Sequence, residues 1–186
     1  DCIAKCMETA LSMAKEDPNV YVPQQFENEA NSAAHREQTA KEILEQAGKP
    51  IHGFCSGIGT GGTITGIGEA LKAANPDMEI WAIEPENAAI LSGKEVGSHL
   101  QMGIGDGVIP AILNQEIYDD IAIVTDEEAV RTAKELAAKE GLMCGISSGT
   151  NVAAALRLAK KLGPGKTVVT ILADTAERYF STPLFD

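Results

Sequence analysis

Residues 57–66 read GIGTGGTITG, and only Ser56 separates them from the short apolar run IHGFC at residues 51–55. A helical pattern of apolar residues begins at the end of this glycine-rich stretch and continues to residue 74. Glycine lets the backbone approach a ligand closely, and the following helix points its free N–H groups and positive dipole end into the same space. A strand, a glycine-rich loop and a helix in this order predict a phosphate-binding site.

The segments around this loop alternate between helical and strand-like patterns. Near-continuous apolar runs predict strands at residues 51–55, 79–84, 121–124 and 167–172. Helical spacing predicts helices at residues 2–16, 32–47, 63–74, 126–140 and 150–162. Apolar strands separated by helices are typical of an α/β fold, a parallel twisted sheet with helices on both faces.

Two local signals refine this pattern. Thr125 and Glu128 form a capping box that predicts the start of the helix at residues 126–140. Residues 85–118 are the least regular stretch and contain five glycines, which predicts long loops in the middle of the chain.

Length and composition restrict the classes of function. The 186 residues suit one domain, residues 1–186, and the net charge of −12 argues against a nucleic-acid partner. No apolar run is long enough to cross a bilayer, and no signal-peptide pattern opens the chain, so we expect a cytoplasmic protein without a membrane partner. The chain opens on Asp1 within a helical pattern, and we therefore expect a piece of a longer protein.

The four cysteines do not form a metal-binding pattern. Cys2, Cys6, Cys55 and Cys144 contain no C-x-x-C pair, and no histidine lies at ligand spacing from the first two. We expect reduced thiols, most of them in the core, and no metal site.

The glycine loop also fits a different template. Gly57, Gly59 and Gly62 spell G-x-G-x-x-G, and Glu84 follows where a ribose-binding acid would lie in a nicotinamide-binding Rossmann domain. Hydroxyls at Thr60, Thr63 and Thr65 favour a terminal phosphate monoester, which has more charged oxygens per phosphorus to bind than a pyrophosphate. A purely structural turn is the third interpretation, and the conformational cost of so many glycines disfavours it.

Five segments together resemble the cysteine synthases, also called O-acetylserine sulfhydrylases. They are QQFENEAN at 24–31, SGIGTGGTITG at 56–66, GIGDGVIP at 103–110, GLMCGISSG at 141–149 and ADTAERYFST at 173–182. They occur in the family's order and span nearly the whole chain. The resemblance implies a fold-type II enzyme dependent on pyridoxal 5'-phosphate, with the tryptophan-synthase-β fold.

The resemblance also assigns roles to individual residues. The residues implied to hold the cofactor phosphate are Gly59, Thr60, Gly61, Gly62 and Thr63. Ser147 would face the pyridine nitrogen, with Asp174 and Thr175 on the same side, and Gly103, Ile104 and Gly105 would belong to the substrate loop. Residues 147–149 and Asp174 also allow a plain interpretation as helix or strand caps.

The implied reaction is β-replacement of O-acetyl-L-serine by sulfide, which gives L-cysteine and acetate. A serine hydroxyl can hydrogen-bond the ring nitrogen but cannot keep it protonated as a carboxylate would, and this favours β-elimination. The family also implies a homodimer and a partner in the C-terminal tail of serine acetyltransferase. Cystathionine β-synthase and serine/threonine dehydratase remain alternatives within the fold.

No residue of this chain is assigned as catalytic. None of the eleven lysines stands in the family's motif for the Schiff-base lysine, which lies in an N-terminal segment absent from this chain. The chain therefore matches the C-terminal portion of the family and is expected to be inactive alone. Met102 stands where the family usually has glutamine, which affects the expected substrate contacts.

Overall fold

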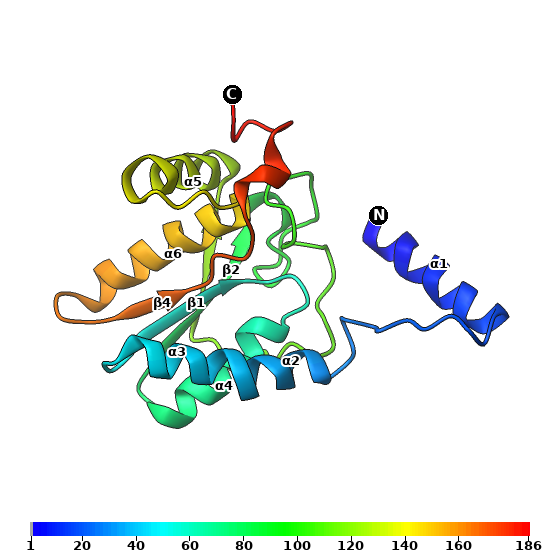
Figure 1. The fold of residues 1–186 in the computed structure, drawn as a ribbon, viewed down its shortest axis with the longest axis horizontal. Coiled ribbons are helices and arrows are strands. Elements are labelled where there is room, and N and C mark those ends of the chain that lie inside the picture. Colours follow the sequence, from blue (N-terminus) through cyan, green and yellow to red (C-terminus); the bar gives the residue numbers. More distant parts are fainter. Residues whose placement is uncertain (1) are drawn as a thin grey trace.

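A four-stranded parallel sheet forms the centre of the molecule. The computed structural model describes residues 2–186. The strands are β1 (Gly53–Gly57), β2 (Glu79–Pro85), β3 (Asp120–Val124) and β4 (Val168–Thr170), in the spatial order β3-β2-β1-β4 (Figure 1). All three strand pairs are parallel, so the carboxyl ends of the strands lie at one edge of the sheet.

Helices cover both faces of the sheet, which confirms the predicted α/β architecture. In Figure 1 one layer contains α2 (Ala30–Ala34), the π-helical turn η1 (His35–Thr39), α3 (Ala40–Ala47) and α4 (Gly62–Ala74). The other layer contains α5 (Asp126–Glu140) and α6 (Ile146–Leu162). Two 3₁₀ turns, η2 (Glu86–Ala88) and η3 (Ala176–Tyr179), lie in the connecting segments.

Each face of the sheet has its own hydrophobic core. Successive side chains of a strand point to opposite faces, so Phe54 packs with Ile64 and Ile67 of α4 while Cys55 packs with Leu158 of α6. These side chains are fully buried. The near-continuous apolar character of the strands therefore reflects burial on both faces.

The ends of several elements differ from the sequence prediction. Helix α6 begins at Ile146, four residues earlier than expected, with Gly145 as its N-cap. Residues 147–149 therefore lie in the first turn of the helix, and the interpretation of these residues as a cap is wrong. Strand β4 covers only residues 168–170 of the predicted 167–172.

The predicted capping box is half formed. The Thr125 side chain accepts a hydrogen bond from the Glu128 backbone N–H at 3.2 Å, as expected for the N-cap of α5. The Glu128 carboxylate instead pairs with Arg157 of α6. This ion pair joins the two helices of one layer.

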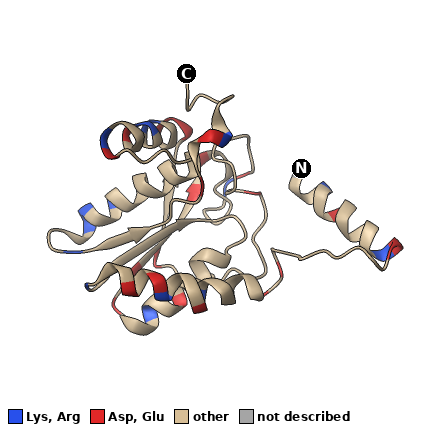
Figure 2. Ribbon diagram, in the orientation of Figure 1, with Lys and Arg blue, Asp and Glu red and all other residues tan. Residues whose placement is uncertain are grey.

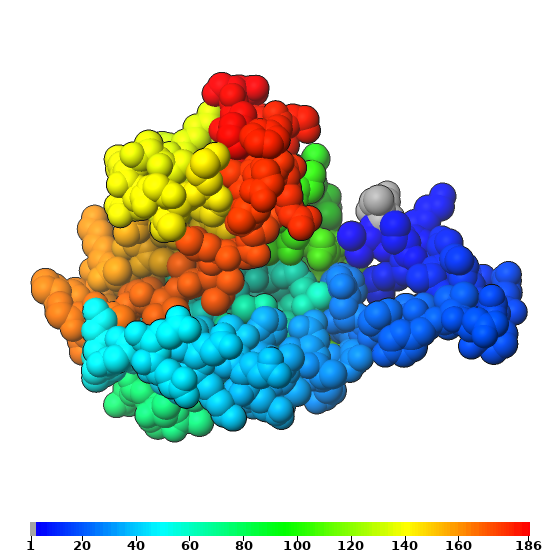
Figure 3. All heavy atoms as spheres, viewed as in Figure 1, coloured from blue at the N-terminus to red at the C-terminus, as the bar shows by residue number. Residues whose placement is uncertain are grey.

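Helix α1 (Cys2–Glu16) lies outside the two-layered body. Residues 17–29 connect it to α2, and Figures 1 and 3 show it on one side of the molecule. Its apolar side chains Ile3, Leu11 and Met13 are partly exposed. Along residues 2–186, no helix is both long enough and apolar enough to span a membrane.

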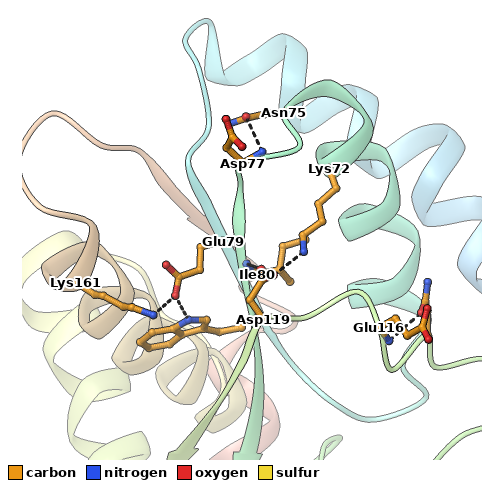
Figure 4. Close-up of polar contacts among 10 residues, drawn as sticks. Lys72, Asn75, Asp77, Glu79, Ile80, Glu116, Asp119 and Lys161 are labelled. Carbon is orange, nitrogen blue, oxygen red and sulfur yellow. Dashed lines mark hydrogen bonds and ion pairs between the residues drawn. The ribbon is translucent and has the colours of Figure 1, made fainter.

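Hydrogen bonds and ion pairs connect side chains at the amino-terminal edge of the sheet (Figure 4). The Glu79 carboxylate accepts a hydrogen bond from the Trp81 indole at 2.7 Å and pairs with Lys161. Asp119 pairs with Lys72 at 2.8 Å and accepts the Ile80 backbone N–H at 2.8 Å. Figure 2 shows most other charged residues on the helices and loops around the sheet. The carboxyl edge has no comparable set of ion pairs among the described residues.

His35 connects the layer of α2 and α3 to α4. Its Nε2 lies 3.2 Å from the Thr63 hydroxyl, and its Nδ1 lies 3.1 Å from the Thr39 hydroxyl. Burial lowers the pKa of His35, because desolvation disfavours the imidazolium form. The neutral ring can hydrogen-bond both hydroxyls, which ties the π-helical turn to the start of α4.

A methyl group at Gly149 should destabilise the contact between α5 and α6. A Cβ at this position would overlap the carbonyl oxygen of Ala129 and lie 2.8 Å from the Ala133 nitrogen, both of which belong to helix backbone. We expect Gly149→Ala to lower the free energy of unfolding by about 1–3 kcal/mol in urea denaturation. The control is Leu156→Ala on the exposed face of α6, where a change within about 0.5 kcal/mol is expected. Equal unfolding midpoints for the two variants would contradict the close packing of Gly149 against the backbone of α5.

The His35 pKa predicts a loss of stability at acidic pH. The unfolded chain carries His35 with its ordinary pKa of about 6.5, whereas the native pKa is lower, so the unfolded state binds more protons as the pH falls. Stability from this group is therefore complete above about pH 6.5 and decreases below it. We expect His35→Gln to reduce the difference between urea midpoints at pH 7.5 and pH 5, since glutamine does not titrate. An unchanged difference would show that His35 is not the source of the acid sensitivity.

Candidate active site at the carboxyl ends of β1 and β4

A cavity of about 260 Å³ lies at the carboxyl ends of β1 and β4. Its lining comes from the glycine loop, the loop around residue 103, the first turns of α6 and the segment after β4. The lining residues are Ser56, Gly57, Gly59, Thr60, Gly61, Thr63, Met102, Gly103, Ile104, Ser147, Asn151, Ile171, Ala173 and Asp174. β1 leads into α4 on one face of the sheet, and β4 follows α6 on the other. Ligands of open α/β sheets bind at such a change of face.

The glycine loop packs closely against the loop at residues 103–105. A Cβ at Gly59 would overlap the Gly103 carbonyl oxygen, and the Gly105 N–H donates to the Ile58 carbonyl at 2.9 Å. Gly61 has a φ of +81° and caps the N-terminus of α4, and a Cβ there would approach Leu113 at 2.8 Å. Glycine is thus required at both positions, one for the close approach and one for the left-handed backbone.

Two threonines, Thr60 just before α4 and Thr63 in its first turn, line the cavity beside the glycine loop. The Thr60 Oγ1 accepts hydrogen bonds from the Asn31 side chain at 2.9 Å and from the Gly62 N–H at 3.3 Å. Its own hydrogen remains available to donate to a ligand. No lysine or arginine lines the cavity among the described residues, so an anion there would bind to N–H groups, hydroxyls and the α4 dipole.

The opposite wall contains Ser147 and Asp174. Ser147 lies in the first turn of α6, and no hydrogen bond of its hydroxyl is found within residues 2–186. The Asp174 Oδ2 accepts a hydrogen bond from the Tyr179 hydroxyl at 2.7 Å, whereas its buried Oδ1 lacks a partner in the described part of the chain. Burial, together with the Asp174 carboxylate, raises the pKa of Tyr179 and keeps this hydroxyl a donor. This wall therefore presents the Ser147 hydroxyl to the cavity, while the Asp174 Oδ1 is buried against Gly145.

The structure brings most of the sequence-predicted site residues together. Eight of them line the cavity, namely Gly59, Thr60, Gly61, Thr63, Gly103, Ile104, Ser147 and Asp174. Three do not. Gly62 is the first residue of α4, Gly105 binds the Ile58 carbonyl, and Thr175 forms a bridge with Cys144.

Two asparagines near the cavity, Asn31 and Asn151, are not among the residues predicted from the sequence. Asn31 holds Thr60, and it lies in the segment 24–31 that carries part of the family resemblance. Asn151 lies on α6 four residues after Ser147, on the same face of the helix. A polar residue on this otherwise buried face was the only available signal.

The position of Glu84 argues against a dinucleotide site. Its carboxylate accepts hydrogen bonds from the Leu91 N–H at 2.7 Å, the Ser92 N–H at 3.1 Å and the Ser92 hydroxyl at 2.8 Å. Glu84 is also almost fully buried. Both oxygens are therefore used within the protein, and the side chain is not available to bind a ribose.

The larger groove beside α5 differs from this cavity in the charges that line it. This groove has a volume of about 630 Å³ and runs between α5 and the C-terminal residues, with Asp126 and Glu127 at the start of α5 along its edge. These carboxylates occupy the helix end that would attract an anion. Among residues 2–186 no group of His, Cys, Asp and Glu side chains is suited to hold a metal ion.

Three cysteines, Cys6, Cys55 and Cys144, are free thiols. Cys6 is exposed, whereas Cys55 and Cys144 are buried as expected. Burial raises the pKa of Cys55 to about 11, so this thiol stays protonated at neutral pH.

The chain is similar to known cysteine synthases. The chain is 47% identical over 182 residues to a probable cysteine synthase of Bacillus subtilis, and the match covers 96% of this chain and 58% of that protein. It is 51% identical over 183 residues to cysteine synthase B of Campylobacter jejuni, covering 96% of this chain and 60% of that protein. The chain thus spans about three fifths of the length of these relatives.

A solved structure shares the fold. The crystal structure of an O-acetylserine dependent cystathionine β-synthase from Helicobacter pylori gives a TM-score of 0.92 at 37% identity, covering 97% of this chain and 58% of that one. The family described as "Pyridoxal-phosphate dependent enzyme" matches residues 2–174. This match covers nearly the whole chain, and the chain therefore belongs to the family of pyridoxal-phosphate dependent enzymes.

Proposed function

We propose that this chain is the C-terminal part of a cysteine synthase, which replaces the acetoxy group of O-acetyl-L-serine with sulfide. The observation that carries the proposal is the cavity between the glycine loop and Ser147. Relatives named cysteine synthase, at 47–51% identity along most of this chain, support the choice of reaction. In this proposal residues 1–186 form one domain, and the intact protein acts in the cytoplasm as a homodimer that can bind the tail of serine acetyltransferase.

The lining of the cavity has groups suited to both ends of pyridoxal 5'-phosphate. The phosphate would lie at the N-terminus of α4, held by the backbone of Gly59 and Gly61 and by the hydroxyls of Thr60 and Thr63. The free Ser147 hydroxyl would donate to the ring nitrogen at the opposite wall. When bound, this cofactor supplies an aromatic ring that withdraws electrons from the α-carbon of an amino-acid substrate.

The residues of this chain would bind and orient the cofactor in the cavity. Gly103 and Ile104 form the wall beside the glycine loop, and the almost fully buried Ile104 side chain gives this wall an apolar base. Ser147 donates as a neutral hydroxyl and does not fix a proton on the ring nitrogen. The Asp174 side chain lies on the same side, where the Tyr179 hydroxyl donates to its Oδ2.

The acid–base group of the reaction would come from outside these residues. Among the described residues no lysine lines the cavity. A primary amine is needed to bind the cofactor aldehyde and to transfer the substrate proton. We therefore propose that the 186-residue chain binds the cofactor phosphate but does not catalyse the reaction alone.

The phosphate site can be tested with pyridoxine 5'-phosphate, which has the ring and phosphate of the cofactor but no aldehyde. We expect Thr60→Val and Thr63→Val each to weaken its binding about tenfold or more, because a hydrogen bond to a charged group contributes about 1.5–3 kcal/mol. Isothermal titration calorimetry measures this change. The control is Thr9→Val, whose hydroxyl donates to the Lys5 carbonyl at 2.8 Å on α1, away from the cavity. Binding of NAD in place of pyridoxine 5'-phosphate would favour the dinucleotide alternative.

The reaction itself requires the polypeptide that also contains the family's lysine motif. This longer protein should form L-cysteine from O-acetyl-L-serine and sulfide, whereas the 186-residue chain should form none. Replacing sulfide with homocysteine distinguishes a cystathionine β-synthase. Cysteine formation by the 186-residue chain alone would refute the assignment of the acid–base group.

A further inference from the structure

The pairing of β1 with β4 stops at the edge of the cavity. The register pairs Gly53 with Val168 and Cys55 with Thr170, and the Gly53 N–H donates to the Thr167 carbonyl at 3.1 Å. In a parallel ladder this contact repeats every two residues. Two repeats further on, the Gly57 N–H would donate to the Ile171 carbonyl.

The Asn151 side chain occupies the position of that hydrogen bond. Its Oδ1 accepts from the Gly57 N–H at 2.8 Å, and its Nδ2 donates to the Ile171 carbonyl at 2.8 Å. A side-chain amide has the donor and acceptor of a peptide group, so it can stand between two strands and satisfy both. The two backbone groups that would pair with each other are therefore separated by one carboxamide.

Neighbouring contacts hold Asn151 in this position. The residue is almost fully buried on α6, and its own carbonyl lies 3.7 Å from the Cys55 thiol. Three residues earlier on the same helix face, the Ser148 hydroxyl oxygen accepts from the Ala173 N–H at 3.0 Å. The start of α6 thus replaces β1 as the hydrogen-bonding partner of the chain that follows β4.

The cavity begins where the strands separate. Gly57, Asn151, Ile171 and Ala173 all belong to its lining. Direct pairing of Gly57 with Ile171 would draw these two walls together, since paired strands lie about 4.8 Å apart. The separation also ends β4 at Thr170, which explains why this strand is shorter than its apolar sequence predicts.

We propose that Asn151 is a positioning residue, whose carboxamide keeps the ends of β1 and β4 apart at the width that admits the ligand. The binding measurement below rests on the proposed cofactor site, whereas the measurement of hydrogen bonds does not. Asn151 acts through Gly57 and Ile171, the two backbone groups that it bridges.

The variant Asn151→Asp tests the amide with almost no change of shape. An ionised carboxylate accepts from the Gly57 N–H but cannot donate to the Ile171 carbonyl, and its charge repels a bound phosphate. Position 151 is almost fully buried, and burial raises the pKa of a carboxyl group because desolvation disfavours its charged form. Once protonated at lower pH, this group regains a donor and restores both contacts. We expect pyridoxine 5'-phosphate to bind about tenfold or more weakly than to the unmodified chain at pH 8, with most of this difference lost at pH 5.5.

Asn75→Asp is the matched control. The Asn75 Nδ2 donates to the Ile51 carbonyl at 3.0 Å, and its Oδ1 accepts from the Asp77 N–H at 3.3 Å, at the end of the sheet remote from the cavity (Figure 4). This variant loses the same kind of donor and gains the same charge. We expect its affinity for pyridoxine 5'-phosphate to equal that of the unmodified chain at both pH values.

NMR couplings across hydrogen bonds test the separation directly. The Gly57 nitrogen should couple to the side-chain carbonyl carbon of Asn151 in the unmodified chain. In Asn151→Ala it should couple to the Ile171 carbonyl carbon, because the ladder can then close.

The outcomes separate the two proposals. Asn151→Asp binding with unaltered affinity at pH 8, or Asn75→Asp losing as much affinity, would overturn the role of Asn151. If the unmodified chain does not bind pyridoxine 5'-phosphate, the cofactor site is wrong and the couplings alone decide the matter. Absence of the coupling between Gly57 and Asn151 then overturns the inference.

Discussion

The separation of β1 from β4 is the constraint on which the rest of the site depends. Along most of the sheet, backbone groups pair with each other, and side chains fill the space above and below. At Gly57 and Ile171 this pairing gives way to the Asn151 carboxamide. The start of α6 consequently lies opposite the start of α4, with the cavity between them. Two helix N-termini on one open edge create a region that favours negative charge.

This arrangement attracts an anion locally in a protein whose overall charge repels one. The chain has a net charge of −12, and the cavity has no lysine or arginine among its described lining residues. Short-range donors must therefore outweigh a repulsive long-range field. Hydrogen bonds from N–H and hydroxyl groups depend on direction and distance, whereas the field is screened by salt over about 8 Å at physiological ionic strength. Such a site selects a phosphate by its shape.

The sequence predicts those parts of the fold that depend on local patterns. The sheet, its covering helices and the glycine loop follow from apolar periodicity and from glycine at positions such as Gly61. The early start of α6 and the short β4 were not predicted, because both depend on contacts between distant segments. The Ser148 hydroxyl and the Ala173 N–H are 25 residues apart in the sequence. Asn151 is 20 residues from Ile171 and 94 residues from Gly57. The family resemblance supplied Ser147 and Asp174, which no local pattern distinguishes from helix and strand caps.

Under the proposed function, Ser147 and Asp174 would have different roles at the ring side of the cavity. A carboxylate in contact with the ring nitrogen would hold a proton there, whereas the Ser147 hydroxyl contributes only a neutral hydrogen bond. Tyr179 binds one oxygen of Asp174 and leaves the other unpaired and buried. Tyr179 thus fixes the Asp174 carboxylate in the wall of the cavity, which leaves Ser147 as the hydroxyl that would contact the ring nitrogen.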